Sequence, residues 1–127
     1  DDIYLRDVNL ESTVTVSLSN SSAEINLNCI NPAISPDGNR ILFITDYNGF
    51  PYLDQNGLLD VFLFNRQEGF TKRISVGTYG VETNGETEYA AISPDGLYVG
   101  FLSFATNLTA EADLNGTADY FLRGPIP

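Results

Sequence analysis

Ala33-Ile34-Ser35-Pro36-Asp37-Gly38 returns as Ala91-Ile92-Ser93-Pro94-Asp95-Gly96 about 58 residues further along the chain. The flanking segments repeat with it, because Ser17 matches Ser75 at the same offset. A fixed period of this length is typical of repeat architectures, in which each unit stacks on a neighbour to bury its apolar faces. The duplication therefore predicts the architecture more firmly than the activity, since a stacked scaffold hosts many functions.

The composition excludes several classes of protein. The 127 residues are 43% hydrophobic and 12% aromatic, which is enough for one packed core. A net charge of −11 would repel a phosphate backbone, so we expect no nucleic-acid partner. The chain has no His and a single Cys29, which removes imidazole catalysis, His-ligated metals and an internal disulfide. We expect no membrane span, no catalytic residue and no enzymatic activity.

The pattern of hydrophobic residues predicts an all-β protein built from short strands. Alternation of apolar and polar residues predicts half-exposed outer strands at 14–18 and 72–76. Consecutive apolar residues predict strands covered on both faces at 41–44 and 99–102. A third kind of strand, entered each time from an Asp, is predicted at 3–5, 61–64 and 120–122. No amphipathic stretch is long enough to indicate a helix.

The repeated Ser-Pro-Asp-Gly segments predict tight turns. Pro at the second position has the φ angle of a type I turn, and Gly occupies the fourth position in both Ser35 to Gly38 and Ser93 to Gly96. We therefore expect each segment to join a short strand, such as 33–35, to the apolar strand that follows it.

These paired segments, each followed by an apolar strand and later by Asp-Val-Phe-Leu-Phe-Asn65 or Asp-Tyr-Phe-Leu-Arg123, resemble the TolB-type β-propeller repeat of bacterial envelope and secreted proteins. The resemblance covers nearly the whole chain and looks closest to the long-repeat, extracellular or envelope branch of the family. It implies four-stranded antiparallel blades of about 58 residues each, and an extracellular or periplasmic location at the cell envelope.

The resemblance also implies how the chain divides into blades. Residues 1–30 would be the third and outer strands of one blade, residues 31–88 a complete blade, and residues 89–127 the first three strands of another. A propeller needs at least about four blades to close, so this incomplete propeller of about two blades would leave apolar faces bare. We expect either that several copies assemble or that the chain is part of a longer polypeptide or fibre.

One repeated loop has the spacing of a cation site. Ca²⁺ takes oxygen ligands from alternate positions of a loop in which Gly permits a sharp turn. Asp113-Leu114-Asn115-Gly116-Thr117-Ala118-Asp119 fits this scheme. Side-chain oxygens would come from Asp113, Asn115 and Asp119, a carbonyl from Thr117, and a first ligand from Glu111.

The earlier copy, Asp54-Gln55-Asn56-Gly57-Leu58-Leu59-Asp60, would bind more weakly because Tyr52 stands where the first ligand is expected. Its ligands would be Asp54, Asn56, the carbonyl of Leu58, and Asp60. An alternative interpretation stays open: Asn-Gly is a common turn dipeptide, and Asp before a strand bonds its own backbone, so both loops would be structural turns.

Two functions follow as expectations. The first is a non-enzymatic scaffold or interaction module of a secreted or envelope protein that binds a protein partner or further copies of itself. The alternative is a noncatalytic propeller region of a larger secreted hydrolase, or a carbohydrate-binding module in which loop aromatics stack on sugars. Those aromatics are Tyr47, Phe50, Tyr52, Tyr79 and Tyr89.

Overall fold

The computed structural model describes residues 1–19, 25, 28–49 and 55–127. Within these ranges the chain forms antiparallel sheets and one 3₁₀ turn, η1 (Thr78–Gly80), which confirms the all-β prediction. The first sheet holds β1 (Tyr4–Asp7) and β2 (Ser12–Thr15). The second sheet holds, in spatial order, β3 (Ile30–Ile34), β4 (Arg40–Thr45), β5 (Asp60–Asn65) and β6 (Phe70–Arg73). The third holds β7 (Thr87–Ile92), β8 (Val99–Ser103) and β9 (Asp119–Arg123).

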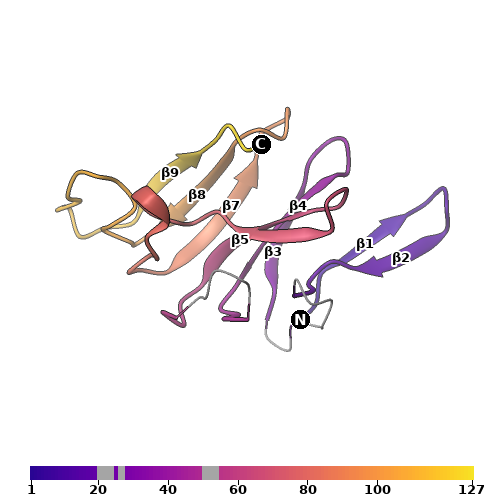
Figure 1. The fold of residues 1–127 in the computed structure, drawn as a ribbon, viewed down its shortest axis with the longest axis horizontal. Coiled ribbons are helices and arrows are strands. Elements are labelled where there is room, and N and C mark those ends of the chain that lie inside the picture. The colour runs from indigo at the N-terminus through magenta and orange to yellow at the C-terminus, as the bar shows by residue number, and fades with distance from the viewer. Residues whose placement is uncertain (20–24, 26–27, 50–54) are drawn as a thin grey trace.

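The three sheets follow one another like the blades of a fan, with the first and third sheets at opposite ends (Figure 1). Consecutive strands pair with each other, so the second sheet has the predicted inner-to-outer order of a four-stranded blade. The sheets start at Tyr4, Ile30 and Thr87, whereas the division into 1–30, 31–88 and 89–127 was inferred from the repeat. Those blade boundaries stay a prediction.

The Ser-Pro-Asp-Gly turns have the same hydrogen bonds in both copies. The amide of Gly38 donates to the Ser35 carbonyl at 2.8 Å, and Gly96 donates to Ser93 at the same distance. Both glycines have positive φ, at 70° and 73°, which favours Gly because it lacks a Cβ. The hydroxyl of Ser35 accepts the amide of Arg40 at 3.0 Å. Each turn thus reverses the chain directly into a central strand.

The outer strands end earlier than the sequence predicted. The expected ranges were 14–18 and 72–76, but β2 ends at Thr15 and β6 at Arg73. A serine side chain explains both differences. The amide of Val61 donates to Ser75 Oγ at 2.9 Å, and the amide of Ile3 donates to Ser17 Oγ at 3.1 Å. Because a hydroxyl accepts the bond that a strand carbonyl would take, the ladder stops there.

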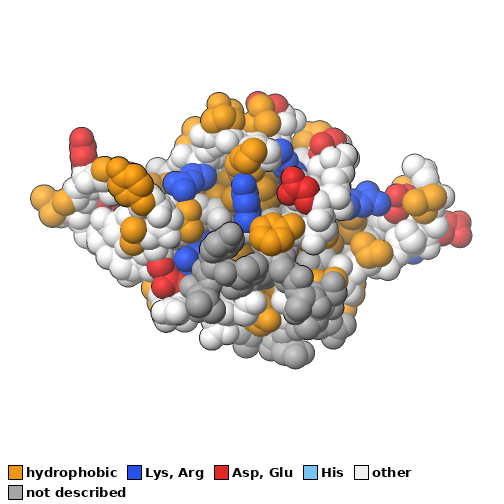
Figure 2. Space-filling view, in the orientation of Figure 1, with side chains coloured by type: hydrophobic (Ala, Val, Ile, Leu, Met, Phe, Trp, Pro, Cys, Tyr) orange, Lys and Arg blue, Asp and Glu red, His pale blue; other side chains and the backbone are white. Residues whose placement is uncertain are grey.

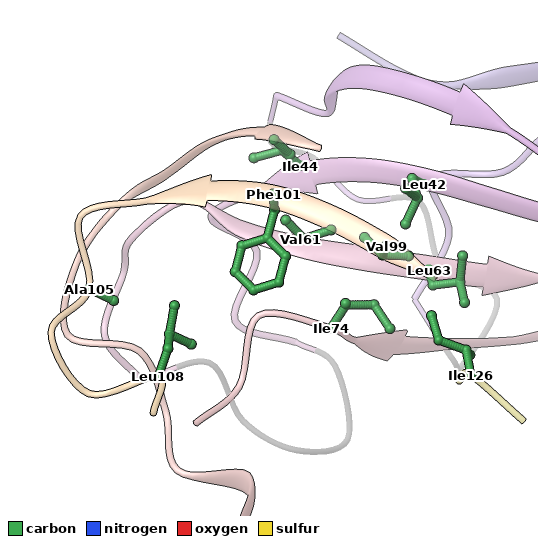
Figure 3. Packing of buried hydrophobic residues seen from close by; sticks show 10 residues of the cluster. All are labelled: Leu42, Ile44, Val61, Leu63, Ile74, Val99, Phe101, Ala105, Leu108 and Ile126. Carbon is green, nitrogen blue, oxygen red and sulfur yellow. The ribbon is translucent and has the colours of Figure 1, made fainter. Parts of the chain in front are cut away.

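Two apolar layers lie between the sheets. Between the first and second sheets, Ile3 and Val16 pack with Ile41, Phe43 and Phe62, and the two phenylalanine rings stack with centroids 6.1 Å apart. Between the second and third sheets, the side chains of β4 and β5 meet those of β8 (Figure 3). That cluster consists of Leu42, Ile44, Val61, Leu63, Ile74, Val99, Phe101, Ala105, Leu108 and Ile126.

The second sheet is covered on both faces and the third on one. From Ile41 to Thr45 every residue of β4 is buried, as predicted. In β8 the prediction of two covered faces is wrong, because burial alternates from Val99 to Ser103. The reason is that β8 has a sheet against one face and none described against the other. Tyr89, Tyr120 and Leu122 on the uncovered face are 61%, 83% and 73% exposed.

Polar contacts also join the second and third sheets. The guanidinium of Arg40 donates to the carbonyl of Gly96 at 2.6 Å and to those of Ile126 and Pro127 at 3.1 and 2.9 Å. Nearer the inner strands, Asn31 Nδ2 donates to the carbonyl of Glu88 at 2.7 Å. These bonds satisfy backbone carbonyls where the two sheets meet, and they set the orientation of one sheet on the other.

Two equivalent leucines test the one-sided burial of the third sheet. Leu63 in β5 is 3% exposed, and Leu122 occupies the matching place in β9. We expect Leu63→Ala to lower the free energy of unfolding by about 2–5 kcal/mol, because it leaves a cavity between packed sheets. We expect Leu122→Ala to change it by less than about 0.5 kcal/mol. Urea unfolding followed by circular dichroism measures both, and equal losses would contradict the packing.

Candidate functional site

The carboxylate of Asp60, the first residue of β5, is the centre of a network of side-chain hydrogen bonds. This residue is completely buried. Its Oδ1 accepts the hydroxyls of Ser75 at 2.5 Å and Thr83 at 2.9 Å. Its Oδ2 accepts Arg73 Nη1 at 3.2 Å and Asn56 Nδ2 at 3.4 Å. Four donors therefore compensate a charge that would otherwise be costly to bury.

Arg73 links this carboxylate to a second one. Its Nη1 lies 2.9 Å from Glu82 Oε1, and the Arg73 side chain is 7% exposed. Glu82 Oε1 also accepts the backbone amides of Gln55 at 2.6 Å and Asn56 at 3.4 Å. The ion pair thus anchors the loop before β5 to the segment that follows β6. We call Asn56, Asp60, Arg73, Ser75, Glu82 and Thr83 the carboxylate hub.

The two carboxylates of the hub have opposite pKa shifts. Burial raises the pKa of Asp60 above its usual value, although the Ser75 hydroxyl and the Arg73 guanidinium oppose the rise. Partial burial would also raise the pKa of Glu82, but Arg73 and the amides of Gln55 and Asn56 outweigh it and lower that pKa. The Ser75 hydroxyl donates to a carboxylate that Thr83, Arg73 and Asn56 also hold, so the hub joins the outer strand to the start of β5.

Parts of the hub recur in the first and third sheets, where fewer residues take part than in the second. In the first sheet, Ser17 Oγ donates to Asp2 Oδ1 at 3.3 Å and accepts the amide of Ile3, as Ser75 does for Asp60 and Val61. In the third sheet, Asp119 holds the place of Asp60. The Asp before each of these strands and the Ser17–Ser75 match are visible in the sequence. The sequence does not show that they meet, because Asp and Ser lie about 15 positions apart and come together only when the strands pair.

The two Asp-x-Asn-Gly loops contain the same turn. Asn56 Oδ1 accepts the amide of Leu58 at 2.7 Å, and Asn115 Oδ1 accepts the amide of Thr117 at 2.8 Å. The side-chain amides then donate forward, Asn56 to Asp60 and Asn115 to Asp119, the latter at 2.8 Å. Gly57 and Gly116 have φ of 65° and 68°. These are the bonds that the structural-turn interpretation requires.

The predicted Ca²⁺ ligands are only partly brought together. Asp113 Oδ1 accepts the amide of Asn115 at 3.1 Å, and Thr117 Oγ1 donates to Asn115 Oδ1 at 3.0 Å. Glu111 contributes its carbonyl to a bond from Thr109 Oγ1 at 2.8 Å. In the first loop Asp60 is bound by Arg73, and Asp54 lies outside the described residues.

Across the ranges that the structure covers, no three Asp, Glu or Cys side chains gather as a metal site. A loop that binds through amide and carbonyl oxygens would not be recognised in that way. The Ca²⁺ sites therefore stay a prediction, with Glu111, Asp113, Asn115, Thr117 and Asp119 in the second loop and Asp54, Asn56, Leu58 and Asp60 in the first.

Loop aromatics differ in their exposure. Tyr79, in η1, is fully exposed and has φ of 62°, and Tyr89 on β7 is 61% exposed. Tyr47 packs against the apolar layer between the first two sheets, which is the structural role for such a residue. Phe50 and Tyr52 lie outside the described residues.

A cavity of about 290 Å³ lies between the turns at 37–39 and 66–67 of the second sheet, and two others lie where sheets meet. One of about 240 Å³ lies beside β6 and the C-terminal residues, and one of about 260 Å³ lies between β1 and β3. Both are smaller than most ligand pockets, and neither is lined by residues of the hub other than Arg73. None of the helical structure described is long and apolar enough to cross a membrane.

The stacked antiparallel sheets, with strands ordered from an inner to an outer edge, define a module of β-propeller blades. The comparisons agree. The structure is similar to TolB from Acinetobacter baumannii, with a TM-score of 0.52 and 22% identity over 97% of this chain. It is also similar to the tricorn protease, with a TM-score of 0.60 and 13% identity over 99% of this chain. The fold is therefore the TolB-like propeller fold that the sequence predicted.

The chain spans only 24% of the TolB structure and 12% of the tricorn protease structure. No family model matches the sequence, and the search of curated proteins finds no match. At these identities the similarity shows the fold alone.

Removal of Arg73 tests the hub. We expect Arg73→Met to lower the free energy of unfolding by about 3–5 kcal/mol at neutral pH, because Asp60 is left as an unpaired buried charge. The variant raises the folded-state pKa of Asp60 further above its unfolded value. The loss of stability that comes from Asp60 is therefore absent where Asp60 is protonated in both the folded and the unfolded state. It grows as pH rises through the folded-state pKa of Asp60. Urea unfolding at about pH 4 and pH 7.5 measures the difference.

Arg66→Met is the matched control. Arg66 is 47% exposed and lies 3.9 Å from Asp7, so its loss should cost less than about 1 kcal/mol at either pH. The double variant Arg73→Met with Asp60→Asn should recover much of the stability, because no charge is left buried. Two outcomes would contradict this role of the hub. Arg73→Met could lower the free energy of unfolding as little as Arg66→Met does, or its effect could be the same at acid pH as at neutral pH.

The Ca²⁺ prediction has a direct test in calorimetric titration after chelation. If the loop binds Ca²⁺, about 1 mM of the ion should release heat and raise Tm, and Asp113→Asn should abolish both effects. A chain that gives no heat and the same Tm has structural turns at both loops. The variant Asp37→Asn controls for the loss of one surface carboxylate, since Asp37 lies in a Ser-Pro-Asp-Gly turn.

Proposed function

We propose that this chain is a non-enzymatic scaffold module of a secreted or envelope protein, which binds a protein partner or further copies of itself. It acts as a self-assembling unit or as part of a larger repeat protein or fibre. One observation supports the proposal above all others: within the described residues nothing covers one face and one edge of the third sheet, and large apolar side chains lie on that face.

The face is continuous across the three strands. The register places Tyr89 opposite Leu102, and Leu102 opposite Tyr120, so these residues form one row across the sheet. Leu122 lies on the same face, because side chains two apart on a strand point the same way. The corresponding face of the second sheet is buried by the third. A face of this composition favours contact with another sheet over contact with water.

The space-filling view shows hydrophobic side chains on the part of the molecule that carries β9 and the preceding loop (orange, at the left of Figure 2). Acidic groups lie at its margin, consistent with the net charge of −11. An apolar centre with a charged rim is the usual composition of a protein–protein interface.

The alternative function is a noncatalytic propeller region of a larger secreted hydrolase. The observation that favours it is the similarity to part of the tricorn protease. On this alternative the same free face would bind a neighbouring blade of the same polypeptide. Among the described residues, the exposed Tyr79 and Tyr89 support a carbohydrate-binding role.

Light scattering after size exclusion tests the scaffold proposal. We expect the mass to rise above that of one chain as protein concentration increases, and Tyr120→Lys to lower it toward one chain, because a charge on the face opposes its burial. Tyr79→Lys is the matched control, since Tyr79 is also exposed, at 101% against 83% for Tyr120, but lies in η1. A stable monomer at every concentration would contradict self-assembly.

A further inference from the structure

We propose that the free edge of β9 binds one more antiparallel strand, and that Asp119 selects a strand that carries Arg and Ser in the spacing of Arg73 and Ser75. The inference rests on the proposed function, because it names the kind of partner that the third sheet accepts. Two Asp–Ser bridges of this chain, and a third Asp at the matching place without a serine, carry it.

The edge of β9 has no strand against it in the described residues. The third sheet ends at β9, whereas β5 at the matching place pairs with β6. In β5 the backbone of Val61 faces β6, since its carbonyl accepts the amide of Ile74 at 2.7 Å and its amide donates to Ser75 Oγ. Tyr120 holds the place of Val61, so its amide and carbonyl face the open edge. Unpaired edge groups of this kind are a template for strand addition.

Two copies of the arrangement are closed by a serine from the next strand. Ser75 bridges the carboxylate of Asp60 and the amide of Val61, and Ser17 bridges Asp2 and the amide of Ile3. The same three groups recur although the second copy is buried and Asp2 is exposed. The bridge therefore forms with an exposed carboxylate as well as with a buried one, although the serine is buried in both copies.

The third copy has the acceptor but lacks the serine. Within the part of the chain that the structure describes, the Asp119 carboxylate receives one bond, from Asn115 Nδ2 at 2.8 Å. Asp60 receives the equivalent amide and three further donors, the Ser75 and Thr83 hydroxyls and Arg73. Asn115 thus holds Asp119 at the start of β9, and the carboxylate can accept further hydrogen bonds from a hydroxyl and a guanidinium.

Charge favours the same partner. Asp119 lies in a chain of net charge −11, so a strand with a basic residue meets an attractive field as well as a specific acceptor. The register of β5 and β6 places Arg73 opposite Phe62, which predicts that the incoming Arg lies opposite Phe121. The incoming Ser, two residues later, then reaches Asp119 and the Tyr120 amide.

The probe is a fluorescent peptide with the sequence of residues 68–78, titrated into the full chain with a chelator present and followed by anisotropy. We expect saturable binding that weakens roughly tenfold when the peptide carries Ser75→Ala or when the protein carries Asp119→Asn, because each change removes a hydrogen bond to a charged group. Glu111→Gln removes the same charge from the same loop and should leave affinity unchanged.

Hydrogen exchange locates the bound strand. We expect the amides of Tyr120 and Leu122 to become protected by the peptide, and the Tyr120 amide to lose most of its protection with the Ser75→Ala peptide, because Val61 at the matching place donates to Ser75 Oγ. The inference would be overturned if the peptide did not bind, or if its affinity were unchanged by both Ser75→Ala and Asp119→Asn. Protection at another sheet would overturn it as well. If the chain self-associates but neither binds the peptide nor responds to Asp119→Asn, this inference fails and the proposed function stands.

Discussion

Burial of sheet faces is the constraint on which the structure depends. A four-stranded sheet with apolar residues on both faces is stable only between two other layers, and the second sheet has both. Leu42, Ile44, Val61 and Leu63 are buried because β8 lies over them, while Phe43 and Phe62 are buried by the first sheet. The third sheet has one neighbour, and its other face keeps Tyr120 and Leu122 in contact with solvent. Stability and exposure in this protein are therefore both consequences of how many sheets are stacked.

The polar groups of the blade follow from the same arrangement. A carboxylate can be buried at the start of β5 only because Ser75, Thr83, Arg73 and Asn56 converge on it. The outer strand is thereby held by side chains as well as by its ladder, and the loop before β5 is held to the segment after β6 through Glu82. In a medium of low dielectric constant such a network is strong when complete and costly when one member is missing.

The proposed function depends on the difference between the second sheet, which is covered on both faces, and the third sheet, which in the described part of the chain has an uncovered face and edge. In the complete blade the hydroxyl of Ser35 donates to Asp37 and that of Ser75 donates to Asp60, so these polar groups stabilise the turn and the outer strand. The open features lie at one end of the stack. They are the edge of β9, the uncovered face of the third sheet, and the carboxylate of Asp119, which accepts a bond from Asn115. They suit recognition of another polypeptide, since backbone groups at an edge and apolar side chains on a face are what a further strand or sheet binds.

The repeated Ser-Pro-Asp-Gly segments and the period of the chain were sufficient to predict an all-β stack of blades, the order of strands in the complete blade and the burial of β4. They were sufficient because turn chemistry and hydrophobic pattern are local properties of the sequence. The ends of β2 and β6, the one-sided burial of β8 and the donors around Asp60 could not be read in this way. Each depends on which distant side chain arrives beside a given backbone group, and only packing of the sheets decides that.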